Sequence, residues 1–261
     1  MSDLDRNYAS PFGRAAGRDA AAVDAGLRAY MLRIYNYMTI GLAITGFAAM
    51  GVYMGAVAEP ANAVAYFGKV PLTQFGVLMF ASPLKWVFML APLAMVFAIS
   101  FGINRLKPAT AQLLFWAFAA LMGISLSSIF LVYTHTSIVR VFFITAASFG
   151  ALSLYGYTTK RDMTGMGSFL MMGLFGIIIA SVVNIFVASS MLQFVVSVVG
   201  VLIFAGLTAY DTQRLKNDYI YGAASQGGEV AERAAITGAL SLYLNFINLF
   251  TLLLQLLGQR D

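Results

Sequence analysis

Cysteine is absent from the 261 residues, and His135 is the single histidine. Without cysteine the chain forms no disulfide, no zinc–thiolate site and no thiol nucleophile. One histidine also excludes the histidine clusters that bind catalytic metals. The sequence contains no glycine-rich phosphate loop and no hydrolase nucleophile elbow. We therefore expect neither a cofactor nor enzymatic activity.

Charge is also scarce. Charged residues make up 10% of the chain and apolar residues 60%, whereas a soluble domain carries roughly 25% charged residues. So few charges cannot cover the surface of a soluble protein, and the apolar surplus must face lipid. The net charge of +5 does not indicate nucleic-acid binding, because the basic residues lie in short loops between apolar runs, where they set membrane topology.

Apolar residues gather in segments that are each near the ~20 residues needed to cross a ~30 Å hydrocarbon core. There are seven: 35–57, 83–103, 109–133, 138–157, 168–187, 191–210 and 235–257. They predict an all-α integral membrane protein built as a seven-transmembrane-helix bundle.

Polar segments lie outside this domain. Residues 1–28 are expected to form a mobile polar tail, and residues 29–261 the transmembrane domain. The longest outer connection, 58–82, contains a moderately apolar stretch at 75–80, which is compatible with an interfacial or re-entrant piece.

The basic residues predict the orientation. Twelve lie in the tail and in the loops after the second, fourth and sixth segments, and four lie on the other side. Because cytoplasmic loops carry the excess of lysine and arginine, this split places the N-terminus in the cytoplasm and the C-terminus outside.

Asp211, at the inner end of the sixth segment, is the one acidic residue close to the membrane interior. It is either a solvated interfacial residue or part of an ion pathway, since ionisable groups in spans face polar cavities and pair. Arg105 ends the second segment at a similar depth, so a pair with Asp211 is allowed. As an isolated observation, Arg105 is better explained as a positively charged anchor.

Amides within the spans are further candidates. Asn245 and Asn248 lie three residues apart on one face of the last segment. Because an unsatisfied amide in hydrocarbon is costly, both should face the bundle interior, either as interhelical hydrogen-bonding groups or as lining of a pathway. Asn184 has the same two interpretations, and the structural one is favoured.

The run Ala205-Gly206-Leu207-Thr208-Ala209-Tyr210-Asp211-Thr212-Gln213-Arg214-Leu215 resembles the signature of the Bax-inhibitor-1 family, the transmembrane Bax inhibitor motif proteins. The last segment, from Gly238 to Gly258, and the stretch from Gly123 to Leu126 also resemble that family. The resemblance covers nearly all of the chain after the tail and is greatest to the bacterial branch. It implies seven helices with the last one central, in the bacterial inner membrane.

The resemblance also implies a function. Members are described as pH-sensitive calcium-leak channels in which two carboxylates share a proton and an arginine at the end of the second helix pairs with the first carboxylate. Asp211 matches the first carboxylate and Arg105 the arginine. Other bacterial members are implicated as modulators of a membrane-anchored ATP-dependent protease. A secondary transporter is less favoured, because no internal repeat is visible.

Asn245 departs from the family pattern, because it stands where the second carboxylate belongs. An amide has no proton to lose in the physiological range and supplies no second charge for Ca²⁺, which prefers carboxylate oxygen. Three outcomes follow from this departure. The pH response is weak or shifted, or it depends on Asp211 alone, or this branch does not leak calcium.

Overall fold

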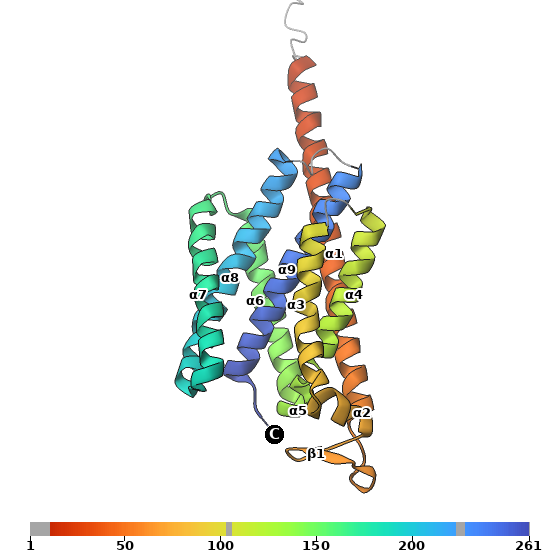
Figure 1. Ribbon diagram of the computed structural model, residues 1–261. Helices are drawn as coiled ribbons and strands as arrows, with labels where there is room; N and C mark the ends of the chain where they lie inside the picture. Colours follow the sequence, from red (N-terminus) through yellow and green to blue (C-terminus); the bar gives the residue numbers. More distant parts are fainter. Residues whose placement is uncertain (1–10, 103–105, 223–227, 261) are drawn as a thin grey trace, which may run out of the picture.

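The computed structural model describes residues 11–102, 106–222 and 228–260, with side chains from Val23 onward except at residue 100. Over these ranges, seven long helices run up and down the molecule (Figure 1). Their bounds are α1 (Pro11–Ala56), α3 (Leu84–Gly102), α4 (Pro108–Leu126), α6 (His135–Thr158), α7 (Thr164–Val187), α8 (Ser190–Tyr221) and α9 (Gly228–Leu257). A short helix, α5 (Ile129–Val132), extends α4.

The lengths and compositions of the helices agree with the predicted membrane spans. Within the described residues, six helical segments are long and apolar enough to cross a membrane, and a bent pair, Gln74–Ala81 with Leu84–Ile99, gives a seventh. The start of α1 and the C-terminus lie at opposite ends of the bundle (Figure 1), as an odd number of crossings requires. The all-α membrane bundle is therefore confirmed. The boundary at residue 28 stays a prediction, although α1 runs through it without a break.

The connection between α1 and α3 contains regular secondary structure. The strands β1 (Ala65–Phe67) and β2 (Val70–Leu72) form an antiparallel hairpin, and a short 3₁₀ helix, η1 (Pro60–Asn62), precedes it. Next, α2 (Gln74–Gly76) and the π-helical turn η2 (Val77–Ala81) bend by 62° into α3. The hairpin was not predicted, because strands of three residues leave no periodic signal.

Short hydroxyl side chains cap the N-terminal ends of two spanning helices. Thr134 precedes α6 and its side chain accepts a hydrogen bond from the Ser137 amide, while Ser189 precedes α8 and accepts from the Leu192 amide. Such N-caps satisfy backbone N–H groups that have no partner within the helix. They fix where the chain turns back into the bundle.

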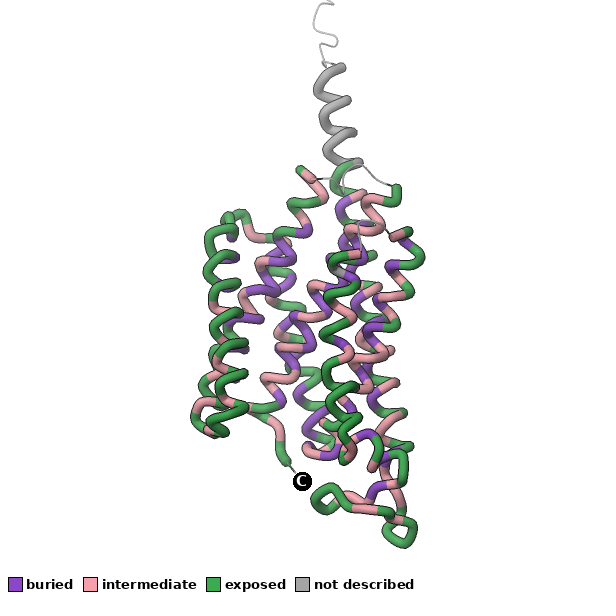
Figure 2. The backbone as a smooth tube through the Cα atoms, in the orientation of Figure 1, coloured by how far each residue is buried: buried purple, intermediate pink, exposed green. Residues whose placement is uncertain are grey.

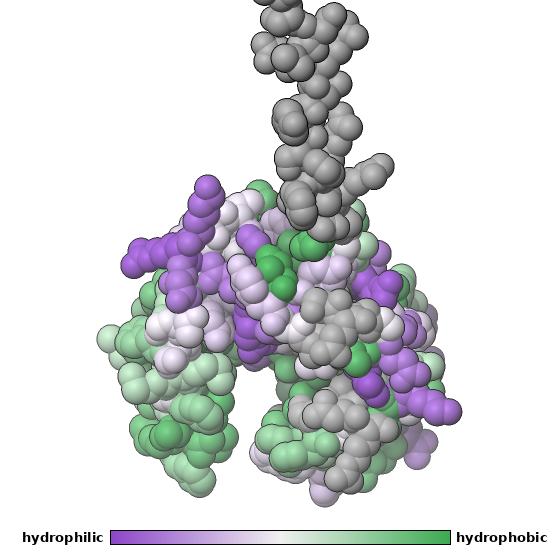
Figure 3. Space-filling model, turned by 90° about the horizontal axis from the view of Figure 1, so that it is seen from above, coloured by the Kyte–Doolittle hydropathy of each residue, from purple (hydrophilic) through white to green (hydrophobic). Residues whose placement is uncertain are grey.

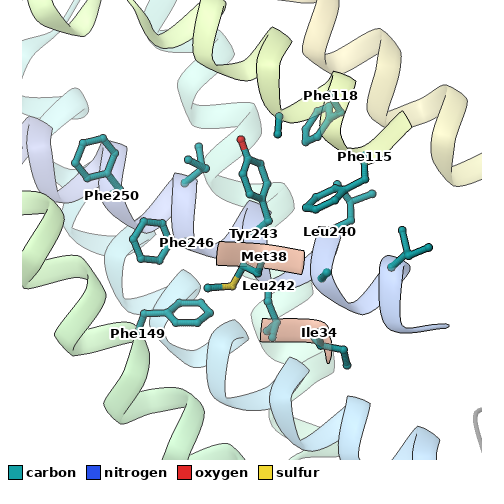
Figure 4. Close-up of a cluster of buried hydrophobic side chains, with 14 of the residues drawn as sticks. Ile34, Met38, Phe115, Phe118, Phe149, Leu240, Leu242, Tyr243, Phe246 and Phe250 are labelled. Atoms are coloured by element: carbon teal, nitrogen blue, oxygen red, sulfur yellow. The ribbon is translucent and has the colours of Figure 1, made fainter. Parts of the chain in front are cut away.

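The last helix is central, as predicted. Half of the most apolar window of α9 is buried inside the protein, compared with 6% of that of α7, and buried residues concentrate along α9 and the helices around it (Figure 2). Tyr243 of α9 is fully buried and packs edge-to-face on Phe115 and Phe118 of α4 (Figure 4). Its hydroxyl lies 2.6 Å from Thr45 Oγ1 of α1. The Tyr243 side chain thus joins α1, α4 and α9.

Close contact between α6 and α8 depends on Gly156. A methyl group added there would overlap the backbone carbonyl of Ala209, whereas one added at Gly150, on the same helix, would meet no atom within 4 Å. We expect Gly156→Ala to destabilise the protein by ~1–3 kcal/mol, because the helices must separate. Gly150→Ala should be neutral or stabilising by up to ~1 kcal/mol, from helix propensity. Thermal unfolding of the two variants in detergent measures the difference, and equal midpoints would contradict this account of the contact.

Candidate functional site

Asp211 is buried between α8 and α9, with 6% of its surface exposed. Its Oδ2 accepts two hydrogen bonds from α9, one from Ser241 Oγ at 2.8 Å and one from Asn245 Nδ2 at 2.8 Å. Its Oδ1 lies 3.0 Å from Arg214 Nη2. Three donors therefore surround the carboxylate, as a buried charge requires.

Arg214, on the same helix and three residues after Asp211, is the cation that pairs with it. From the sequence, Arg214 was predicted only to contribute to the membrane topology, as one of the twelve basic residues on the inner side. The spacing of three residues was the signal that could have identified the pair. Arg105 lies outside the described residues, so its predicted pairing with Asp211 stays a prediction.

A cavity of about 740 Å³ adjoins this cluster and extends along α9. Its apolar sides come mainly from α3, α7 and α8, and its polar lining comes mainly from α9 through Ser241, Asn245, Asn248, Thr251 and Gln255. These positions recur every three or four residues, so they form one face of the helix. Seen from above, the surface is hollowed between two apolar lobes. Hydrophilic residues lie where this hollow reaches the middle of the molecule (Figure 3).

The other intramembrane amides are used locally. Asn248 lines the cavity, and its Nδ2 donates to the Leu244 carbonyl one turn earlier. Toward the C-terminal end of α9, Gln255 also lines the cavity and accepts a hydrogen bond from Ser197 Oγ of α8 at 2.8 Å. Asn184 lies elsewhere, at the end of α7, where its Oδ1 accepts from the Ser189 amide. The structure thus brings Asp211, Asn245 and Asn248 to one cavity and places Asn184 outside it.

The residues on either side of Asp211 hold α8 in position. The Tyr210 ring packs where Gly167 of α7 leaves room for it. Thr212 Oγ1 lies 2.9 Å from Ser153 Oγ of α6. Gln213 bridges the turn before α7, accepting from the Met163 amide and donating to the Arg161 carbonyl. The three side chains that flank Asp211 in the run from 210 to 213 therefore fix its depth and rotation.

The same turn carries the carboxylate Asp162. Its Oδ1 accepts hydrogen bonds from the hydroxyl and the backbone amide of Thr164, at 2.6 and 2.9 Å. These bonds favour the ionised form and lower the pKa of Asp162. The two hydrogen bonds therefore stabilise the start of α7, next to the turn that Gln213 bridges, while Asp162 is ionised. This contribution is lost as the pH falls through the lowered pKa of Asp162.

Metal ligation at this site is limited by the residues present. Over the described ranges, no group of three or more histidine, cysteine, aspartate or glutamate side chains converges. Asp211 contributes one carboxylate, and its neighbours contribute amide and hydroxyl oxygens. This set suits transient contact with a hard cation more than tight binding, because tight Ca²⁺ sites use several carboxylates.

Known proteins similar to this chain include several that are named as membrane proteins. A family model described as "Inhibitor of apoptosis-promoting Bax1" matches residues 27–261. An uncharacterized protein of Caulobacter vibrioides is 46% identical over 99% of this chain and 98% of its own length. The inner membrane protein YbhL of Escherichia coli K12 is 42% identical over 90% of this chain and 94% of its own length. An uncharacterized membrane protein of Streptococcus pyogenes is 34% identical over 91% and 96%.

The extent of these matches covers every described helix in whole or in part, and it includes the run from Tyr210 to Gln213 that surrounds the buried carboxylate. The structure also has the fold that the family resemblance implies, in which several apolar helices surround a central last helix. This chain therefore belongs to the Bax inhibitor-1 family of multi-pass membrane proteins.

Proposed function

We propose that this protein is a pH-sensitive cation leak channel, with Ca²⁺ as the ion, gated near Asp211. The polar face of α9 in the cavity carries the proposal. Its oxygen-bearing side chains extend from Ser241 and Asn245 near the carboxylate to Gln255 near the outer end of the helix. Polar residues this deep in membrane-spanning helices usually line a pathway or pair with one another.

The donor set around Asp211 suggests how the pathway is kept closed. Both carboxylate oxygens already accept from Arg214, Ser241 and Asn245. A cation that reaches Asp211 must first displace Arg214, whose side chain is 44% exposed. Because conduction needs sites that a cation enters but also leaves readily, a single, compensated carboxylate fits a slow leak.

Calcium flux into liposomes tests the proposal directly. We expect purified full-length protein, reconstituted into liposomes that contain a calcium-sensitive dye, to admit Ca²⁺ faster than protein-free liposomes at pH 6 or at pH 8. The physical reason is the polar face of α9, which lowers the cost of moving a cation through hydrocarbon. Flux equal to that of protein-free liposomes at both pH values would refute the channel.

Modulation of a membrane-anchored ATP-dependent protease is the second candidate. It is favoured by α1, which extends beyond the other helices at the end where the chain begins (Figure 1). A projecting helix is accessible to a soluble or membrane-anchored partner. The liposome experiment separates the two functions, since protease modulation requires no ion flux.

The orientation is part of the proposal: the N-terminus lies in the cytoplasm of a bacterial cell and the C-terminus outside. The basic residues support it, with twelve on the proposed inner side and four on the outer. Because the sequence contains no cysteine, a single introduced cysteine is the one thiol that a maleimide can label. A cysteine introduced at Gly68, in the β1–β2 turn, should react with an impermeant maleimide in intact cells, and one at Thr159 should react only after lysis. The reverse pattern would overturn the orientation.

A further inference from the structure

A second cavity, of about 470 Å³, lies between α1 and α6. Its walls are mainly apolar, with Leu32 and Met38 from α1 and Phe149 and Leu154 from α6. It adjoins helices of membrane-spanning length, so its apolar part lies at the depth of lipid tails. We call it the α1–α6 groove.

Positive charge gathers at the inner end of the groove. Arg28 lines the opening and is exposed, and no carboxylate of the described residues forms an ion pair with it. Lys216 of α8 lies beside the same opening, since its Nζ donates to the Tyr157 carbonyl at 2.8 Å and sits over the Tyr157 ring. Tyr157 itself lines the groove. Lys216 is thus engaged by Tyr157, and Arg28 is the cation left to meet the charge of a ligand at the opening, without an ion-pair partner among the described residues.

The polar groups in the wall of the groove already have partners within the protein. Tyr35 Oη lies 2.6 Å from Ser153 Oγ, which lies 2.9 Å from Thr212 Oγ1. Thr212 in turn donates to the Thr208 carbonyl. A ligand in the groove therefore meets mostly apolar surface along the wall, and it meets charge only at the opening.

From this arrangement we propose that the α1–α6 groove binds one anionic phospholipid, with the phosphate at Arg28 and an acyl chain along Leu32 and Leu154. The cation without a carboxylate partner selects the headgroup by charge, and the apolar walls at membrane depth accept the chain. Each basic residue near a membrane surface attracts anionic lipid by about 1 kcal/mol, which corresponds to about fivefold in affinity. The proposal is independent of ion conduction.

Native mass spectrometry of the delipidated full-length protein in detergent tests it. The probes are dioleoyl phosphatidylglycerol and dioleoyl phosphatidylcholine, which share their chains and differ in charge. The wild type should retain one phosphatidylglycerol about fivefold more than phosphatidylcholine. Arg28→Gln should reduce this preference to about one, and Arg28→Lys should keep it. Arg33→Gln is the matched control, because Arg33 is exposed on α1 but lies about 140° around the helix.

The acyl chain is tested at Gly150, which lines the groove and has no atom within 4 Å of an added Cβ. Gly150→Leu should lower retention of both lipids at least fivefold, while Gly176→Leu, on an open face of α7, should leave retention unchanged. The proposal is overturned if the wild type shows no headgroup preference or if Arg33→Gln acts as strongly as Arg28→Gln. It is equally overturned if Gly150→Leu retains lipid like the wild type.

Discussion

Replacing Asn245 with aspartate is expected to make Ca²⁺ flux steeply dependent on pH. The Asn245 amide nitrogen lies 2.8 Å from Asp211 Oδ2, so the variant places two carboxylates in contact. Two unit charges 4 Å apart repel by roughly 4 kcal/mol at an effective dielectric of 20. The pair therefore shares one proton, and its loss creates a doubly charged oxygen site that suits Ca²⁺.

The sign of the effect follows from competition between the proton and Ca²⁺ for the same oxygens. Flux and Ca²⁺ binding by Asn245→Asp should rise from pH 6 to pH 8 by about tenfold or more, whereas the wild type should change severalfold less. Dye-loaded liposomes at four pH values measure the slope. Circular dichroism and gel filtration check that the variant keeps its fold.

Asn248→Asp is the matched control for this experiment. Asn248 lines the same cavity three residues further along α9, but its amide bonds the Leu244 carbonyl and not Asp211. The substitution adds the same charge without creating a proton-sharing pair. An equally steep pH response in Asn248→Asp would show that added negative charge, and not the contact with Asp211, causes the effect.

Removing the positive charge of Arg214 is expected to raise Ca²⁺ flux. Arg214→Gln leaves the Asp211 carboxylate with its two hydrogen bonds from α9 but without its cation. A unit charge ~8 Å from a passing ion contributes about 2 kcal/mol at an effective dielectric of 20, and the exposure of Arg214 reduces this by screening. We therefore expect an increase on the order of tenfold in the liposome assay.

Asp211→Asn should have the opposite effect, because it leaves the Arg214 charge uncompensated at the cavity and repels cations. Lys216→Gln is the control, since it removes one positive charge two residues further along α8, where the side chain bonds the Tyr157 carbonyl and does not line the cavity. The charge mechanism is wrong if Arg214→Gln and Asp211→Asn change flux in the same direction, or if Lys216→Gln matches Arg214→Gln.

The membrane bundle was predictable from the sequence because it depends on composition over lengths of about 20 residues. The predicted segment 191–210 lies within α8, and 235–257 lies within α9, which is longer at its N-terminal end. The central position of α9 came from the family resemblance, and its many buried residues confirm it. Asp211 also stood out by elimination, as the one acidic residue near the membrane interior.

What surrounds Asp211 required the tertiary structure. The sequence placed Asp211 at the inner end of the sixth segment and Asn245 within the last one. A hydrogen bond between them depends on the rotation of α8 and α9, which packing of Tyr210 and Gln213 fixes. The pairing of Arg214 with Asp211 depends on side-chain direction in the same way.

The two cavities depend on tertiary structure to an even greater degree. The polar face of α9 is a periodic pattern in the sequence, but only the separation of α3 from α7 leaves it facing a cavity and not buried against another helix. The α1–α6 groove leaves no sequence signal, because its lining residues are ordinary apolar residues of two spans. Composition and periodicity therefore determined which segments enter the membrane, and the contacts between distant segments decided which polar groups meet there.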